Sequence, residues 1–181
     1  MTEREFVHEL PDEAEATLVS SGRRTDAERL VERLRELGWT LAVAESLTGG
    51  LVVSELVDVP GASAVVRGGV VAYATELKQR LVGVDAALLE AHGPVHPRVA
   101  RQMAEGVRTS LGPGDGIADV GIATTGIAGP GSPDGQPVGT VHLAVSTALG
   151  VRVESLVLEG DRATVRSEAA ARAIRLALDA L

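Results

Sequence analysis

The sequence contains no cysteine, and it contains only one tryptophan, one tyrosine and one phenylalanine. The absence of cysteine excludes disulfide bonds, thiolate metal sites and a cysteine nucleophile, and it is compatible with a reducing cytoplasm. Because aromatic residues make up only 2% of the chain, the core must be built from valine, leucine, isoleucine and alanine. A length of 181 residues predicts one domain over residues 1–181, since it is short for two.

Long apolar runs are also missing, and none approaches the length of a membrane-spanning helix. Residues 1–16, MTEREFVHELPDEAEA, are polar and acidic, unlike the basic and apolar segments of a signal peptide. The formal net charge of -8 repels nucleic-acid phosphates. We therefore predict a cytoplasmic protein with no nucleic-acid or membrane partner, and a partly flexible N-terminal extension over residues 1–24.

Strand and helix patterns alternate along the rest of the chain. Apolar spacing predicts helices over residues 25–38, 48–61, 75–83, 85–93, 96–112 and 161–181, and strands over 39–46, 68–74, 116–126, 139–148 and 150–160. Thr25 and Asp161 are the expected N-caps of the first and last helices, and Gly38 is the expected end of the first. The last two strands predict an antiparallel hairpin. This order predicts an α/β fold with three α/β/α layers, a mixed, mostly parallel sheet and a C-terminal antiparallel hairpin.

The stretch AESLTGG, residues 44–50, is the first that can carry chemistry. Ser46 follows a buried strand and precedes a glycine turn into a helix, which is where open α/β sheets place ligands. The N–H groups of Thr48, Gly49 and Gly50 begin a helix, so they are candidate donors to an oxyanion or a phosphate. The alternative is structural, with Ser46 or Thr48 capping the helix and the glycines forming the turn.

Tyrosine and lysine occur once each, five positions apart, as Tyr73 and Lys78. The chain has seventeen basic residues besides histidine, so sixteen are arginines. A lysine in a desolvated pocket can lose its proton whereas an arginine effectively cannot, so only Lys78 can serve as an amine base. The Tyr73 hydroxyl can relay a proton or hold that base in position. The alternative is a tyrosine at the edge of the core and a solvated lysine on a helix.

A segment rich in glycine and proline, ATTGIAGPGSPDGQPVG, follows the third predicted strand. Its glycines allow a ligand to approach the backbone closely, and the strand delivers them to the same sheet edge as Ser46. The segment predicts a phosphate or ribose site, although a plain surface loop is the alternative. Its spacing matches neither a P-loop nor a dinucleotide-binding turn. The expected substrate-binding residues here are Thr125, Gly126, Ile127, Ala128 and Gly129.

In this order, the three stretches resemble the CinA C-terminal domain family, the nicotinamide-nucleotide amidohydrolases. The similar runs begin near Leu41 and continue to the end of the chain; they are AESLTGGLVVSELVDVPGAS, GGVVAYATELKQRLVGV, GPVHPRVARQMAEG, TTGIAGPGSPDGQPVGTVHLAV and GDRATVRSEAA. The resemblance implies hydrolysis of the carboxamide of nicotinamide mononucleotide to nicotinic acid mononucleotide and ammonia. It also implies that Ser46 is the nucleophile and that Tyr73 and Lys78 assist it. The chain departs from the family pattern at Leu47, where cysteine is usual, near Thr75, where asparagine is frequent, and in a loop one residue shorter after Pro130.

Other functions fit the sequence less well. A short-chain dehydrogenase also uses serine, tyrosine and lysine, but its tyrosine and lysine are four positions apart and its glycine-rich turn opens the chain. A non-catalytic nucleotide-binding module of the same fold remains the alternative function. His92 and His96 are separated by Gly93 and Pro94, which prevents a shared helical face, so no metal site is predicted. Amide hydrolysis by Ser46 needs no cofactor, and a homo-oligomer is expected for a domain of this size.

Overall fold

A computed structural model of the chain describes residues 24–132 and 135–181. The extension expected over residues 1–24 therefore lies, except for Arg24, outside the described residues. The helices are α1 (Asp26–Leu37), α2 (Leu51–Val57), α3 (Thr75–Val82), α4 (Ala86–His92), α5 (Pro97–Ser110) and α6 (Arg162–Leu178), with a 3₁₀ turn at Ala62–Ala64. The strands are β1 (Leu41–Glu45), β2 (Val66–Val71), β3 (Val120–Gly126), β4 (Thr140–Thr147) and β5 (Gly150–Val157).

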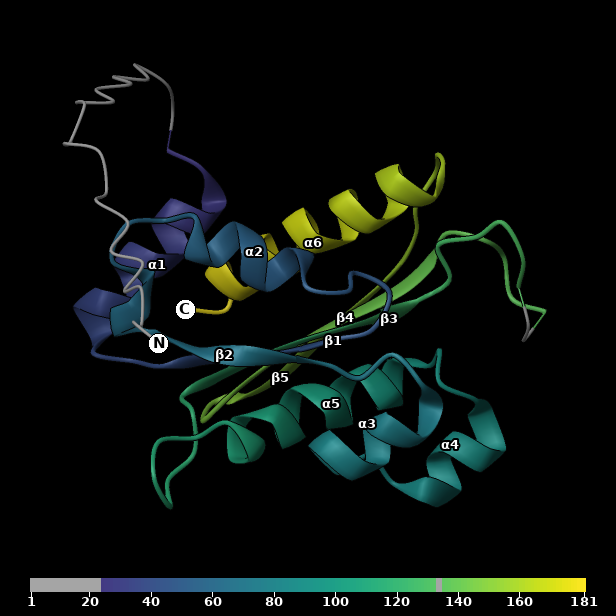
Figure 1. Cartoon of the computed structure of the whole chain (residues 1–181), viewed down its shortest axis with the longest axis horizontal. Coiled ribbons are helices and arrows are strands. Elements are labelled where there is room, and N and C mark those ends of the chain that lie inside the picture. The colour runs from purple at the N-terminus through teal and green to yellow at the C-terminus, as the bar shows by residue number, and fades with distance from the viewer. Residues whose placement is uncertain (1–23, 133–134) are drawn as a thin grey trace, which may run out of the picture.

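The strands form one mixed sheet in the order β2-β1-β3-β4-β5. β1 pairs in parallel with β2 and β3, whereas β4 is antiparallel to both β3 and β5. Four strands thus point one way and β4 alone points the other. Helices α1, α2 and α6 cover one face of the sheet, and α3, α4 and α5 cover the other (Figure 1). The predicted three-layer fold with its C-terminal hairpin is confirmed.

Alternate residues of each central strand enter two separate cores, because successive side chains of a strand point to opposite faces. On β1, Leu41 and Val43 pack in the core beneath α1, α2 and α6. Ala42 and Ala44 pack in the core beneath α5. Helices on both faces leave every residue of β1 buried, which is typical of the centre of a doubly covered sheet.

The ends of the first and last helices follow from local sequence. The Thr25 hydroxyl accepts a hydrogen bond from the N–H of Glu28, and the Glu28 carboxylate accepts one from the N–H of Thr25, which is a complete capping box. Gly38 ends α1 in the left-handed region with φ 66°, where glycine carries no steric penalty. The Asp161 carboxylate caps α6 by accepting from the N–H of Thr164 at 2.8 Å. All three predicted helix boundaries are confirmed.

Parallel strands bring distant segments to one edge of the sheet. β1, β2 and β3 end there and lead into the Ser46 turn, the Tyr73 segment and the glycine-rich loop, respectively. β5 runs in the same direction, so α6, which follows it, begins at this edge as well. Open α/β sheets bind ligands beyond the carboxyl ends of their strands. The topology therefore gathers every predicted site segment at the place where a ligand is expected.

Candidate active site

Ser46 and Lys78 are in direct contact. Lys78, on α3, is only 1% exposed, and Ser46, at the end of β1, is 7% exposed. The Lys78 Nζ lies 3.0 Å from the Ser46 Oγ, and it donates hydrogen bonds to the carbonyl oxygens of Ala72 at 2.8 Å and Tyr73 at 3.2 Å. Lys78 is thus not a solvated helix side chain, and it contacts the serine that the family resemblance implies it assists.

These three contacts prepare the Lys78 amine to act as a base. Burial lowers the pKa of Lys78 to about 8, against a smaller opposite effect of the Glu76 carboxylate. A neutral amine has two N–H donors and one lone pair, and the carbonyls of Ala72 and Tyr73 can only accept hydrogen bonds. When both N–H groups donate to these carbonyls, the lone pair faces the Ser46 hydroxyl. The geometry therefore suits transfer of a proton from Ser46 to Lys78 at close to neutral pH.

Tyr73 contributes to this arrangement in a different way from the one expected. Its carbonyl helps to hold Lys78, but its side chain is 59% exposed. Its hydroxyl accepts a hydrogen bond from the Arg162 Nη2 at 3.1 Å. Within the described residues, that hydroxyl makes no hydrogen bond to Ser46 or Lys78. Of the two expected routes for the Ser46 proton, the contacts favour direct transfer to Lys78, and the assistance of the Tyr73 hydroxyl stays a prediction.

A buried carboxylate fixes the start of α2, next to Ser46. Glu45, 1% exposed, accepts hydrogen bonds from the N–H groups of Gly50 at 2.8 Å, Val52 at 3.2 Å and Val53 at 3.0 Å. The N–H of Gly50 is therefore occupied, and its predicted role as an oxyanion donor is wrong. Glu45 was not among the residues expected from the sequence to belong to the site. Its position, as the single acidic residue at the end of an otherwise apolar strand, could have indicated it.

The backbone of the Ser46 turn leaves other donors available. The N–H of Ser46 donates to the carbonyl of Thr124 at 3.0 Å. The Thr48 hydroxyl lies 2.7 Å from the Thr124 hydroxyl, so its side chain is occupied in the buried interior. Within residues 24–132 and 135–181, the N–H groups of Leu47, Thr48 and Gly49 have no hydrogen-bond partner. These three groups are the candidate oxyanion donors of the turn.

Two arginines of α6 reach the site from the far end of the sequence. Arg162 donates to the carbonyl of Gly129 at 2.8 Å and to the Tyr73 hydroxyl, so it joins the glycine-rich loop to the Tyr73 segment. Arg166 donates to the carbonyls of Leu47 and Thr48 at 2.9 and 2.8 Å. Neither residue was expected from the sequence to belong to the site. The sequence did contain a signal. Cations in the first turns of a helix interact unfavourably with the helix dipole, so two arginines there indicate that they bind other groups.

A cavity of about 220 Å³ opens beside Ser46 and Lys78. Leu47, Tyr73, the α4–α5 loop at Pro94 and Val95, the glycine-rich loop and Arg162 complete its walls. All five predicted residues of that loop line the cavity, namely Thr125, Gly126, Ile127, Ala128 and Gly129, whereas Thr48, Gly49 and Gly50 do not. The Thr125 hydroxyl donates to the carbonyl of Pro94 at 2.8 Å, which ties two walls together.

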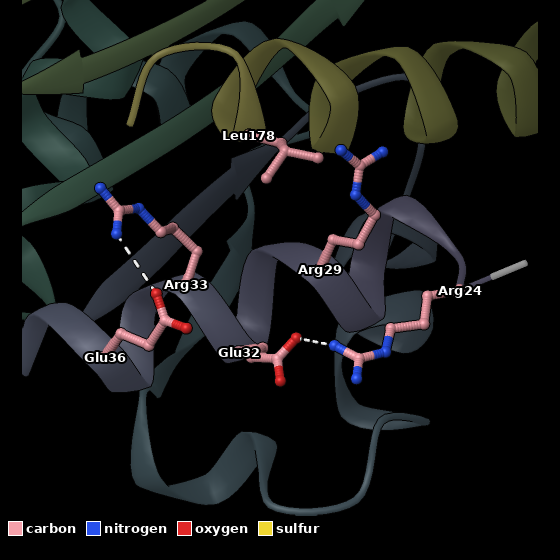
Figure 2. Close-up of a pocket in the computed structure, with 6 residues that line it drawn as sticks. All are labelled: Arg24, Arg29, Glu32, Arg33, Glu36 and Leu178. Carbon is pink, nitrogen blue, oxygen red and sulfur yellow. Dashed lines mark hydrogen bonds and ion pairs between the residues drawn. The ribbon is translucent and has the colours of Figure 1, made fainter.

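A larger hollow, of about 570 Å³, lies between α1 and the end of α6 (Figure 2). Its side chains are mainly charged, and they form ion pairs between Arg24 and Glu32 and between Arg33 and Glu36. Leu178, at its rim, is the last residue of α6, about 24 Å along the helix from Arg162. The hollow contains neither a nucleophile nor an unpaired base, so the Ser46 cavity is the candidate site.

In the described part of the chain, no helix has the length and apolar character that crossing a membrane requires. That part of the chain also holds no group of three or more histidine, cysteine, aspartate or glutamate side chains arranged to bind a metal ion. His92 and His96, four residues apart, stack with ring centres 4.6 Å apart.

Comparison with known sequences agrees with the resemblance. The model of the CinA C-terminal domain family matches residues 23–181. A CinA-like protein of Frankia casuarinae is 50% identical over 137 residues, which cover 76% of this chain and 30% of the relative. A putative competence-damage inducible protein of Desulforamulus reducens is 44% identical over 146 residues, which cover 81% of this chain and 34% of the relative. The chain thus spans about a third of the length of these curated relatives.

Comparison with solved structures gives the same result. A competence-damaged protein (CinA) superfamily member of Escherichia coli superposes with a TM-score of 0.81 and 31% identity, covering 86% of this chain and 88% of that one. A competence or damage-inducible protein of Enterobacter asburiae gives a TM-score of 0.80 and 29% identity, covering 87% and 99%. The sheet and its helical layers are therefore those of solved CinA superfamily proteins.

Proposed function

The chain belongs to the CinA C-terminal domain family, and from this premise we propose that it is an amidohydrolase acting on the carboxamide of nicotinamide mononucleotide. The products are nicotinic acid mononucleotide and ammonia. The observation that carries the proposal is the 3.0 Å contact between the Ser46 Oγ and the buried Lys78 Nζ. A serine hydroxyl is a weak nucleophile until an adjacent base accepts its proton, and this pair supplies both groups.

The first half of the reaction forms an acyl-enzyme. Neutral Lys78 takes the hydroxyl proton of Ser46 while the Oγ forms a bond to the carboxamide carbon. The carbonyl oxygen becomes an oxyanion, held by the backbone N–H of Leu47, the residue after Ser46 that lines the cavity. The C–N bond then breaks, the Lys78 ammonium gives its proton to the leaving nitrogen, and ammonia departs. Ser46 is left as an ester of the pyridine carboxylic acid, and Lys78 is again neutral.

The second half returns the enzyme to its starting state. A water molecule attacks the ester carbon while Lys78 accepts one of its protons, and the same N–H holds the second oxyanion. The bond between the Ser46 Oγ and the carbon then breaks, and Lys78 returns the proton to the Oγ. The carboxylic acid leaves and ionises in solution. Ser46, Lys78, water and backbone donors carry every step.

The shape and charge of the cavity support a nucleotide amide as the substrate. At about 220 Å³, the cavity is below the roughly 300–1,000 Å³ of pockets that enclose a whole ligand, so it suits the pyridine ring and its carboxamide. The phosphate would lie toward Arg162 and the glycine-rich loop. Arg162 lines the cavity and, within the described residues, has no carboxylate partner. Such a cation attracts an anion to a protein whose net charge of -8 would otherwise repel it.

Ammonia release from nicotinamide mononucleotide tests the proposal directly. The wild-type chain should convert the nucleotide to ammonia and nicotinic acid mononucleotide in stoichiometric amounts, whereas Ser46→Ala should not. Ser167→Ala is a matched control, because Ser167 is an exposed serine on α6 that bonds only to the carbonyl of Thr164. A wild-type chain that binds the nucleotide without releasing ammonia would support the non-catalytic binding module instead.

A further inference from the structure

Arg166 binds the turn that carries Ser46 but does not line the cavity. Its Nε donates to the carbonyl of Leu47 at 2.9 Å and its Nη2 donates to the carbonyl of Thr48 at 2.8 Å, across 119 and 118 positions of sequence. A planar guanidinium that bonds two successive carbonyls fixes the orientation of both peptide units. Arg166 is not among the residues that line the cavity. Its contacts therefore act on the nucleophile turn rather than on a bound ligand.

The orientation of these two carbonyls determines where two backbone donors point. In a planar trans peptide the C=O and N–H of one unit point in opposite directions. Because the Arg166 guanidinium binds the Leu47 and Thr48 carbonyls, the N–H groups of Thr48 and Gly49 point away from it. Neither N–H has a partner within the described residues, whereas the next one, of Gly50, is bound by Glu45. A cation on the carbonyls and an anion on the amides thus hold the turn from opposite sides.

Two further features show how closely the turn and Arg166 fit. Gly49 has φ +62°, and a Cβ added to it would lie 3.2 Å from the Arg166 Nη2, so a side chain here would crowd the guanidinium. Arg166 also takes part in no ion pair within the described residues. Its half-buried charge is therefore left uncompensated beside the turn, where it favours negative charge that develops during the reaction.

We propose that Arg166 is a positioning residue for the Ser46 nucleophile, holding in place the turn that presents the Ser46 hydroxyl and the Leu47 N–H to the cavity. This inference rests on the proposed amidohydrolase function. An oxyanion donor acts in the transition state and contributes little to ground-state binding. Loss of Arg166 therefore lowers kcat and leaves KM nearly unchanged. A residue that only supported the fold would not respond to a replacement cation.

Rescue by added guanidinium distinguishes a positioning role of Arg166 from a role in supporting the fold alone. Arg166→Ala should lower kcat about 100-fold, the effect expected when a reacting group is misplaced by about 1 Å, with KM changed less than about threefold. Millimolar guanidinium should restore kcat at least tenfold by occupying the space that the side chain leaves. Arg172→Ala is the matched control, because Arg172 lies on the same helix in an exposed pair with Glu168. It should keep normal kcat and show no response to guanidinium.

A kcat of Arg166→Ala near that of the wild type, or a loss that guanidinium does not restore, would overturn the proposal. If Arg166→Ala does not fold, Arg166→Lys replaces it, since lysine keeps the charge but cannot span both carbonyls with a rigid fork. A lowered kcat with an unchanged KM and a melting temperature near that of the wild type supports the proposal. A normal kcat of Arg166→Lys overturns it.

A second readout does not depend on the substrate. A fluorophosphonate probe phosphonylates an activated serine with loss of fluoride, and the rate of labelling at Ser46 reports the nucleophile turn itself. If the wild-type chain neither reacts with the probe nor releases ammonia, the proposed function fails. If the wild type and Arg166→Ala are labelled at equal rates, the serine is active and only the role of Arg166 is refuted.

Discussion

Replacing Lys78 with methionine removes the proposed base while keeping an unbranched side chain of similar length in a buried site. Because a positioned base contributes about 10²- to 10⁴-fold, Lys78→Met should lower kcat by that factor while nucleotide binding changes less. Lys78→Arg should lower kcat to a similar extent, since arginine does not release its proton near neutral pH. The wild-type kcat should rise up to tenfold for each pH unit below about 8, the pKa of Lys78, and reach a plateau above it.

The same lysine makes an independent prediction about stability. Burial lowers the pKa of Lys78 from its ordinary value of 10.5 to about 8, which corresponds to about 3 kcal/mol. Between these two pH values the unfolded chain holds a proton that the folded chain has released. The free energy of unfolding therefore rises with pH through this window. Below about pH 8, where both states hold the proton, Lys78 adds no pH dependence.

Urea unfolding of the wild type and Lys78→Met at several pH values isolates this effect. Other titrating groups are shared by both proteins, and the Ala72 and Tyr73 carbonyls that lose their donor in the variant give an offset independent of pH. The unfolding free energy of the wild type minus that of Lys78→Met should increase by about 3 kcal/mol from pH 8 to 10.5, the folded and ordinary pKa values of Lys78. A difference that stays constant over this range, together with a wild-type kcat that shows no inflection near the lower value, would refute the reasoning.

Four further predictions concern Ser46, two of its neighbours in the structure and the effect of a metal chelator. Ser46→Ala should abolish ammonia release and leave the melting temperature nearly unchanged, because it removes a hydroxyl and no core volume; activity within tenfold of the wild type would contradict the nucleophile assignment. Glu45→Gln should destabilise the fold by about 2 kcal/mol or more, since it weakens charge-assisted hydrogen bonds to three N–H groups, and equal urea midpoints for the two proteins would argue against that anchor. Arg162→Ala should raise the KM for nicotinamide mononucleotide by about tenfold or more, as expected for loss of a charged contact, but should leave the KM for nicotinamide riboside unchanged; equal effects on both would remove Arg162 from the phosphate site. EDTA should not alter the rate of ammonia release, and an activity that EDTA abolishes and zinc restores would refute the metal-free mechanism.

The sequence by itself determined the elements and their order, because the interactions that set them are local. The capping box of Thr25 and Glu28 spans three residues, and Gly38 ends the same helix through its own backbone freedom. The parallel strands follow from short apolar runs separated by helices, and the carboxyl ends of such strands meet at one edge. The sequence therefore predicted that Ser46 and the glycine-rich loop would meet, whereas the role of Lys78 beside Ser46 was implied by the family resemblance.

Tertiary structure decided how those groups are connected. The direction of the Tyr73 side chain, toward Arg162 rather than Lys78, depends on the helix packed nearby and not on the spacing of five residues. The occupation of the Gly50 N–H depends on a buried carboxylate whose contacts only the folded turn creates. Arg166 reaches the nucleophile turn across more than a hundred positions. Local patterns carry no information about the contacts of Arg162 and Arg166, because the packing of α6 against the sheet and α2 is what brings these side chains to the site.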